Sequence, residues 1–550
     1  MPVQKRVFAS FLASFERDML TVSPPETIYG LAVFVRRFAQ SLLAYSDFDE
    51  FHFFTRGAHS PVRDGELLGS DPRVRVRPLH EFSAAAEQND IRVLHNPWTP
   101  DIGPWTDLRN RMCTRSIPVT GMTHTVSYHS FLPRVLLTMM LSPRETDSIV
   151  CSSVCGRTVM QNWIGHLSAE FGEHIGRPVR FDGRLDTIPI GVDPDEFRPR
   201  EKTPLRKRLQ LPVDATIVLY LGRFSAYDKM DLAPLLLAFQ RASQTPRERP
   251  LALVLAGSAG EFEYADEVDR LTRQMGLAGS VHIVRNVAEG DIPAFYAAAD
   301  IFASPSDNIQ ETFGQSLIEA MASGLPIVCS DWNGYREIVV PNETGLLIPT
   351  YWMPCDRQVS DFAGMSEWLM DHFYLAQSVC VDVERMAGAI ELLASNAALR
   401  MQMGERARQR ALDLYDWRVV IRQYQALWDE LNATADKNPS SSRQDRSWYR
   451  ADLFETFRHY CTQILSDEAT VLVNEEGQLA RSLMHTGQSP FLQTTLLDGV
   501  TDHARQAISV ADLQERVTRT TGCSPDEFRF HLLWLFKYDI VRLTTPDRLN

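Results

Sequence analysis

Apolar residues between positions 217 and 349 come in short runs, and segments long enough to form helices separate these runs. Parallel strands joined by crossover helices produce this alternation, because both faces of such a sheet are buried. The pattern predicts one doubly wound α/β domain. Helices are expected over Leu232–Ala242 and Gln315–Ser323, among others. The expected strands are Ile217–Leu221, Leu251–Leu255, Val281–Val284, Ile301–Ala303, Pro326–Cys329 and Leu346–Ile348.

The first 190 residues repeat this alternation less regularly, which favours a second Rossmann-like lobe over residues 1–190. A short apolar run ends near Pro189–Asp193, so we place the boundary there. Residues 191–414 are assigned to the C-terminal lobe, which contains the regular alternation over positions 217–349. The fold class expected is therefore α/β, with two doubly wound lobes. The strands expected in the N-terminal lobe are Val7–Leu12, Phe51–Phe54, Val74–Val76, Ile91–Leu94, Pro118–Gly121 and Ile149–Ser152.

Helical character dominates the later part of the chain, from Leu399 to Leu431, and we expect its end, about 415–431, to return to the N-terminal lobe. Residues 432–447 have the polar composition of a linker. Residues 448–550 then predict a small, mainly helical domain whose order of elements is loosely that of a winged helix. Within it, Ser509 can cap a helix that has Asp512 in its first turn. Phe528–Tyr538 predicts a further helix.

Composition narrows the classes of partner. The chain has 550 residues and a formal net charge of −14, whereas general nucleic-acid binders carry a basic surface. We therefore expect no nucleic-acid partner. Acidic residues also outnumber basic ones within 448–550, which favours a protein partner or an oligomer contact there over DNA binding.

The eight cysteines are scattered without paired CxxC units, which indicates reduced thiols and a cytoplasmic protein. The first residues lack the order of a secretory signal, and no run approaches the roughly 20 apolar residues that span a bilayer. Phe131–Leu141 is the most apolar candidate for membrane contact. We interpret it as a buried helix; the alternative is contact with an acceptor or, peripherally, with the inner face of the membrane.

Candidate chemistry is concentrated between Ser304 and Glu337, in the sequence SPSDNIQETFGQSLIEAMASGLPIVCSDWNGYRE. A strand should end near Ala303, and a helix should begin just after Phe313-Gly314. A helix N-terminus reached through a glycine-bearing loop offers unpaired backbone N–H groups and a positive dipole end. This arrangement suits a diphosphate. Spacing alone does not distinguish Glu319 from an ordinary solvated helix residue.

The span from Gly191 to Leu431 resembles the retaining glycosyltransferases of family 4, a group that includes glycogen synthase-like and mannosyltransferase-like group 1 transferases. The resemblance lies in ETFGQSLIE, with seven residues between Glu311 and Glu319, and in the following EAMASGLPIV. IPIGVD, Leu221-Gly222-Arg223 and Gly345–Pro349 also match. Family 4 implies the GT-B fold, in which two Rossmann-like lobes face a cleft. It also implies transfer of a hexosyl unit from a nucleotide diphosphate sugar.

The resemblance assigns roles to residues of the donor half. Glu311 would hold hydroxyls of the donor sugar, and Glu319 the ribose. Arg223 and Lys229 would neutralise the diphosphate, although Lys229 lies one position later than in most members. Phe313, Gly314 and Gln315 would offer backbone donors to the distal phosphate, and Gly222 would also contact the donor. A base-binding edge is expected around Asn286.

In the N-terminal lobe the resemblance rests on single residues. His124 matches the position of a histidine near the donor sugar, with His129 as the competing candidate. Gly30 stands where the family has a glycine-rich loop, and it would contact a phosphate or the acceptor. Segment 351–381 falls where the family varies, and we assign it no role.

No cofactor or metal is expected; the co-substrate is a nucleotide diphosphate sugar, with UDP-hexose favoured over GDP-hexose. Two DxD strings, Asp47–Asp49 and Asp193–Asp195, could indicate a metal-bound diphosphate, but the basic pair can replace the charge of the metal. The expected acceptor is a hydroxyl of a glycan or a lipid-linked glycan, as in polysaccharide biosynthesis.

Three alternatives remain at this point. A sugar-nucleotide epimerase of the same fold would turn over the donor without an acceptor. A nicotinamide oxidoreductase needs a glycine fingerprint after a strand, and Leu221–Phe224 has only one glycine. A non-catalytic nucleotide-sugar-binding scaffold would act through residues 448–550.

Overall fold

The computed structural model describes residues 5–11, 30–55, 71–141, 143–259, 263–362, 365, 368–437, 447–475 and 491–544. The chain divides into two compact units. The first comprises residues 1–53, 65–75 and 83–445, and the second comprises residues 54–64, 76–82 and 446–550. The first unit holds nearly all of the two α/β lobes, and the second holds the C-terminal region with two short segments of the N-terminal lobe.

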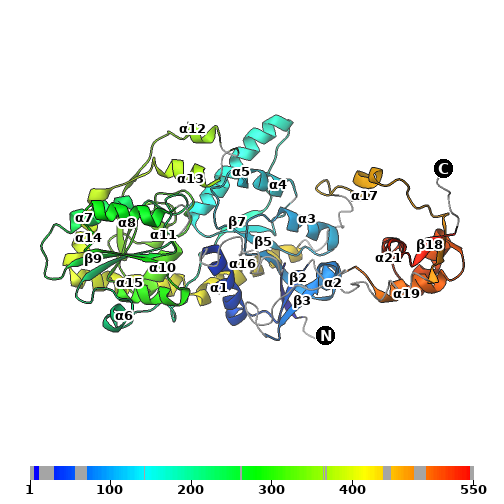
Figure 1. Cartoon of the computed structure of the whole chain (residues 1–550), viewed down its shortest axis with the longest axis horizontal. Helices are drawn as coiled ribbons and strands as arrows, with labels where there is room; N and C mark the ends of the chain where they lie inside the picture. The colour runs from blue at the N-terminus through cyan, green and yellow to red at the C-terminus, as the bar shows by residue number, and fades with distance from the viewer. Residues whose placement is uncertain are drawn as a thin grey trace. The chain divides into compact units, whose positions relative to one another are not determined.

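The C-terminal lobe is built on a six-stranded parallel sheet with the order β10-β9-β8-β11-β12-β13. Helices lie on both faces of this sheet, which is drawn in green in Figure 1. All six expected strands are present: β8 (Thr216–Leu221), β9 (Leu251–Gly257), β10 (Val281–Arg285), β11 (Ile301–Ser304), β12 (Ile327–Ser330) and β13 (Gly345–Ile348). The helices are α6 (Lys202–Arg208), α7 (Ala233–Ala242), α8 (Tyr264–Gln274), α9 (Ile292–Ala298), α10 (Gln315–Ala322), α11 (Tyr335–Ile338), α14 (Val383–Ser395) and α15 (Ala397–Leu414).

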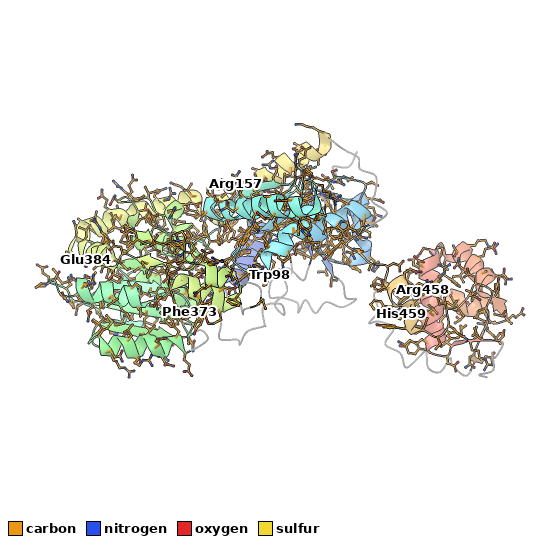
Figure 2. All side chains as sticks on the ribbon, turned by 90° about the horizontal axis from the view of Figure 1, so that it is seen from above. Trp98, Arg157, Phe373, Glu384, Arg458 and His459 are labelled. Carbon is orange, nitrogen blue, oxygen red and sulfur yellow. The ribbon has the colours of Figure 1, made fainter. Side chains whose placement is uncertain are left out.

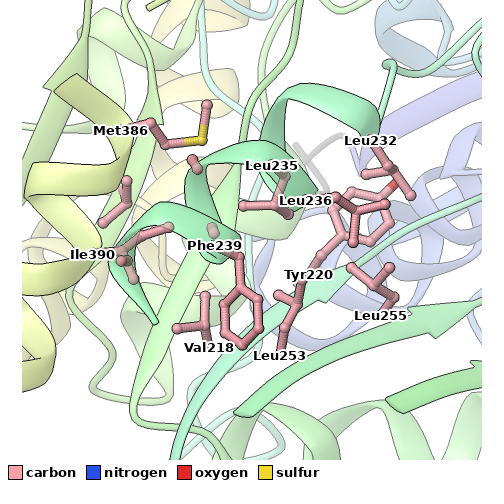
Figure 3. Close-up of a cluster of buried hydrophobic side chains, with 14 of the residues drawn as sticks. Val218, Tyr220, Leu232, Leu235, Leu236, Phe239, Leu253, Leu255, Met386 and Ile390 are labelled. Atoms are coloured by element: carbon pink, nitrogen blue, oxygen red, sulfur yellow. The ribbon is translucent and has the colours of Figure 1, made fainter. Parts of the chain in front are cut away.

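The core of this lobe lies between the sheet and helices α7 and α14. Val218 of β8 and Leu253 of β9 meet Phe239 of α7 and Ile390 of α14, and all four side chains are fully buried (Figure 3). Burial of each such side chain contributes about 1.5–3 kcal/mol. This packing fixes the carboxyl ends of the strands, where ligands bind in sheets of this type.

The N-terminal lobe has a seven-stranded sheet with the order β3-β2-β1-β4-β5-β6-β7. The six strands expected from the sequence are present, although Leu12 lies outside the described residues. The seventh strand, β7, was not expected from the sequence. Its four residues, RLDT, are only half-buried, so no run of apolar residues predicts it. The strands are β1 (Arg6–Phe11), β2 (Glu50–Thr55), β3 (Val74–Pro78), β4 (Asp90–Asn96), β5 (Val119–Met122), β6 (Ser148–Cys151) and β7 (Arg184–Thr187); the helices are α1 (Gly30–Tyr45), α2 (Phe82–Gln88), α3 (Gly103–Met112), α4 (Phe131–Met140) and α5 (Val154–Ile175).

Helix α16 (Trp417–Lys437) follows the C-terminal lobe in sequence but packs on the N-terminal lobe (Figure 1). The Trp428 indole donates to Thr120 Oγ1 at 3.2 Å, and Asn432 Nδ2 donates to the Arg92 carbonyl at 2.7 Å. The helix therefore continues six residues into the segment expected to be a linker. The polar side chain of Asn432 bonds to the lobe, which composition alone does not reveal.

The chain crosses between the lobes twice, and the two crossings are hydrogen-bonded to each other. The Val192 N–H donates to the Tyr415 carbonyl at 2.7 Å, and the Trp417 N–H donates to the Val192 carbonyl at 3.3 Å. A Cβ on Gly191 would lie 2.3 Å from the Trp417 ring, so only glycine fits this crossing. The two lobes are joined through this paired connection.

Segment 351–381 is a loop with helical turns that starts and ends at a two-stranded antiparallel ladder. Its strands are β14 (Thr350–Tyr351) and β15 (Cys380–Val381). Between them lie α12 (Arg357–Ser360) and α13 (Trp368–Ala376).

Residues 447–544 include a three-stranded sheet packed with three helices around a separate apolar core. Ser509 caps α20 by accepting from the Asp512 N–H, as the sequence predicts. The elements are α17 (Leu453–Phe457), β16 (Thr470–Val473), α19 (Thr494–His503), β17 (Ile508–Ser509), α20 (Val510–Thr521), α21 (Pro525–Lys537) and β18 (Val541–Leu543).

Helix α4 is the apolar segment considered above for membrane contact, and Phe131, Val135 and Met139 are buried in the lobe. Among the described residues, no helix combines the length and apolar character needed to cross a membrane.

Candidate functional site

A cavity of about 650 Å³ is lined by both lobes of the first unit. Its C-terminal side is formed where β8, β9 and β11 end, and its N-terminal side by the loops after β4 and β5. The residues proposed from the sequence that line it are His124, Gly222, Arg223, Lys229, Glu311, Phe313, Gly314, Gln315 and Glu319.

Glu311 and Lys229 form an ion pair at the wall of this cavity. Lys229 Nζ lies 2.6 Å from Glu311 Oε2, and Tyr335 Oη is 3.5 Å from the same oxygen. Burial acts to raise the pKa of Glu311, but Lys229, with smaller contributions from the Phe313 N–H and Arg223, lowers the pKa overall. The pair therefore presents an ionised carboxylate and an ammonium to the cavity.

Arg223 lies in the same loop as Lys229, immediately after β8. Its guanidinium lies 3.0 Å from Asp228 Oδ2. Both residues line the cavity. The loop from Arg223 to Lys229 thus places two cations close to the start of α10, although the lysine comes one position later than the resemblance leads one to expect.

Helix α10 begins at this cavity through Gly314, whose φ is 118°. A Cβ at Gly314 would lie 2.7 Å from the ring of Tyr335, so both the backbone angle and the packing require glycine. Phe313 turns its ring toward Tyr415, with centroids 6.0 Å apart. The start of α10 therefore faces the cavity, and a helix start carries unpaired N–H groups and a positive dipole end.

Glu319 lies one turn into α10 and is held by two neutral donors. The Tyr296 hydroxyl donates to Oε2 at 2.9 Å, and Gln315 Nε2 donates to Oε1 at 3.1 Å. Burial raises the pKa of Glu319 to about 7, although both hydrogen bonds act to lower it. The carboxyl is therefore poised to change charge near neutral pH.

His124 faces the cavity from the N-terminal lobe as a neutral imidazole. Burial lowers its pKa to about 4, and its Nε2 lies 2.7 Å from the Pro97 carbonyl oxygen. A carbonyl only accepts, so Nε2 carries the proton and Nδ1 is left as an acceptor. His129, the competing candidate, is exposed and does not line the cavity.

The lobes meet beside this site through hydrogen bonds. Thr312 Oγ1 donates to the His124 carbonyl, and Ser153 Oγ donates to the Thr312 carbonyl at 2.7 Å. The Glu337 carboxylate accepts from the N–H groups of Val154 and Cys155, both at 2.7 Å. The N-terminal lobe is therefore hydrogen-bonded both to the loop that carries Glu311 and to Glu337.

Asn286, which the sequence proposed for the site, does not line the cavity. The Asn286 side chain accepts from the Ala259 N–H at 3.0 Å, and its neighbour Val287 reaches the cavity instead. Gly30 is the first residue of α1, while Leu31 lines the cavity; Thr27–Tyr29 lie outside the described residues.

The DxD aspartates accept hydrogen bonds from backbone N–H groups or pair with arginines. Asp193 Oδ1 accepts from the Asp195 N–H at 2.9 Å, and Asp195 pairs with Arg418. Asp49 accepts from the Arg6 N–H at 2.8 Å, and Asp47 contacts the Arg6 guanidinium.

Several residues that contact the site were not identified from the sequence. Tyr296 holds Glu319, and Tyr335 lies against both Glu311 and Gly314. The only sequence signal for Tyr335 is its place in the stretch from Ser304 to Glu337; Tyr296 lies in an ordinary apolar helix and has none.

Residues 201–356 match the family model for glycosyl transferases group 1. This match covers the strands and loops that supply the C-terminal wall of the cavity, and with the two-lobed GT-B architecture it supports the GT-B group 1 family.

Curated relatives match about 30% of the chain. D-inositol 3-phosphate glycosyltransferase 2 of Catenulispora acidiphila is 34% identical over 169 residues, which are 30% of this chain and 39% of that protein. D-inositol 3-phosphate glycosyltransferase of Xylanimonas cellulosilytica is 33% identical over 171 residues, with the same coverage. The chain thus spans about 39% of the length of these relatives.

Solved structures share the fold at low sequence identity. Sucrose-phosphate synthase from Thermosynechococcus elongatus aligns with a TM-score of 0.53 at 20% identity, over 78% of this chain and 100% of that one. Anabaena HepE in complex with UDP aligns with a TM-score of 0.51 at 15% identity, over the same shares. These alignments confirm the two-lobed GT-B fold.

Proposed function

We propose that this protein is a glycosyltransferase that moves a hexosyl unit from a nucleotide diphosphate sugar to a hydroxyl group, with retention of anomeric configuration. One observation carries the proposal. A single cavity brings together two cations, the start of α10 and two carboxylates, Glu311 and Glu319, at the carboxyl ends of parallel strands.

The donor fits this set by charge and hydrogen bonding. Arg223, Lys229 and the N–H groups at the start of α10 neutralise the diphosphate, which leaves with added negative charge. Glu311 accepts hydrogen bonds from sugar hydroxyls, and Glu319 from the ribose. Because these cations supply the positive charge, the proposed reaction needs no metal ion.

In the proposed step the acceptor hydroxyl attacks the anomeric carbon on the face from which the diphosphate departs. The bond from that carbon to the phosphate oxygen breaks, the bond to the acceptor oxygen forms, and the proton of the hydroxyl passes to the departing oxygen. No protein nucleophile is used. Closure of the lobes limits hydrolysis of the donor by excluding water.

The N-terminal wall is the proposed acceptor side. Trp98, Tyr128 and Phe131 line the cavity there and offer aromatic surface to a glycan or a lipid-linked glycan. The name of the curated relatives adds an inositol phosphate to the acceptors worth testing.

The test measures donor binding, donor consumption and product configuration. HepE was solved with UDP, so UDP-hexoses are tested first, followed by GDP-hexoses, by thermal shift and then by transfer to a panel of acceptors. We expect Glu319→Ala to weaken donor binding and Arg223→Ala to slow transfer about 100-fold. The exposed Arg273 gives the control Arg273→Ala.

Three outcomes would contradict this proposal. Full activity of both variants would overturn the assignment of the site. Conversion of the donor without an acceptor would indicate an epimerase. Loss of activity in EDTA with recovery in manganese would indicate a metal-dependent mechanism.

A further inference from the structure

Helix α13 (Trp368–Ala376) lies outside the part of the chain that matches the family model, which ends at residue 356. The β14–β15 ladder fixes both ends of its segment at the C-terminal lobe. α13 contacts a loop of each lobe, and each of these loops contributes a residue to the cavity.

On the side of the C-terminal lobe, Phe373 stacks on Tyr227, with centroids 4.5 Å apart and an angle of 24° between the rings. Figure 2 labels Phe373 on α13. Tyr227 lies in the Arg223–Lys229 loop, next to Asp228, the partner of Arg223. This loop has no regular helix or strand, so its shape depends on contacts such as this stack and the bond from Asn308 Nδ2 to the Tyr227 carbonyl at 2.9 Å.

On the side of the N-terminal lobe, His372 packs against Tyr128, with ring centroids 5.0 Å apart. The His372 side chain is only 1% exposed, and burial lowers its pKa, so the ring is neutral in this contact. Tyr128 lines the cavity and stacks near Phe131, which lines it as well. Two consecutive residues of α13 thus hold the diphosphate loop and the aromatic wall.

We propose that α13 positions the two reacting halves of the site: Phe373 sets the loop of Arg223 and Lys229, and His372 sets the aromatic wall at Tyr128. This inference rests on the proposed transfer reaction. A displacement of about 1 Å in groups that hold reactants can cost about 100-fold in rate. Phe373 and His372 are positioning residues, since they touch the loops and not the cavity.

The principal variant is Phe373→Leu, which keeps an apolar side chain against the lobe core but removes the stacking ring. Phe373→Ala removes both. Arg357 of α12, in the same segment, has a side chain that is 93% exposed and gives the control Arg357→Ala. We expect Phe373→Leu to lower kcat at least 10-fold and to raise the ratio of donor hydrolysis to transfer, while Arg357→Ala leaves both unchanged.

Hydrogen exchange without any substrate tests the coupling separately from activity. We expect Phe373→Leu to accelerate exchange over 223–229, and His372→Ala to accelerate it over 125–130. Tyr227→Ala combined with Phe373→Leu should be no slower in transfer than the worse single variant, because both remove one contact.

Exchange and kinetics in Phe373→Leu equal to those of Arg357→Ala would overturn the inference. A wild-type protein that transfers no sugar, but whose variants still show the local exchange changes, would instead refute the proposed function and leave the positioning by α13 standing.

Discussion

Four side chains that line the cavity could be predicted from the sequence because a short motif contains or precedes each of them. Glu311, Glu319 and Arg223 lie where the motifs place them, and Lys229 reaches Glu311 despite its later position. The contacts that influence the charge of Glu319 could not be predicted in the same way. Tyr296 meets Glu319 from another helix, and no local pattern in the sequence encodes that distance.

At Glu319 this environment predicts pH-dependent donor binding. Ionised Glu319 accepts hydrogen bonds from ribose hydroxyls more strongly than the neutral acid, and its pKa is about 7. We expect affinity for UDP-glucose to rise severalfold between pH 6 and pH 8 in titration calorimetry. Glu319→Gln should abolish this dependence; the same slope in that variant would assign it to another group.

The same pKa predicts a stability effect of the opposite sign. Burial raises the pKa of Glu319 in the folded state, so the folded protein binds the extra proton between about pH 4.5 and 7, and its stability falls as pH rises through that window. Glu319→Gln carries no charge at any pH. Its melting temperature relative to the wild type, without donor, should therefore increase from pH 5 to pH 8.

Lys229 and Glu311 allow structure and function to be separated. Lys229→Met leaves the Glu311 carboxylate partly buried without its cation, which should cost roughly 2 kcal/mol of stability. Adding Glu311→Gln removes the unpaired charge. Chemical denaturation should show recovery of stability in the double variant, while transfer stays impaired because both donor contacts are lost. Recovery of transfer would exclude these roles.

Among the elements, the strands were the most predictable from the sequence, since a buried parallel sheet requires apolar runs. The helical extension to Lys437 and the course of α13 were not predictable, because both depend on contacts with distant segments of the chain. Asn432 reaches the Arg92 carbonyl across the lobe, and a composition window cannot separate such an asparagine from one in a linker.

The start of α5 also depends on a partner from another lobe. Glu337 accepts the first two N–H groups of this helix, which otherwise lack intrahelical acceptors. We expect Glu337→Ala to accelerate hydrogen exchange at Val154 and Cys155 about 10-fold. Glu343 is exposed on the same lobe, and Glu343→Ala is the control. Unchanged exchange would mean that the lobes do not stay closed through this contact in solution.

For the whole molecule, the separate apolar core of residues 447–544 predicts independent unfolding. Val471, Leu513 and Leu532 are buried within this core, and the described residues that line the cavity of the two lobes lie in the first unit. Calorimetry of the full chain should therefore show two transitions. UDP-glucose should raise the temperature of only the transition that belongs to the lobes, because a ligand stabilises the folded region that binds it. A chain ending at residue 445 should keep that transition and its response to UDP-glucose. If both transitions of the full chain rise together, the C-terminal region is coupled to the donor site, and its role includes more than a separate contact surface.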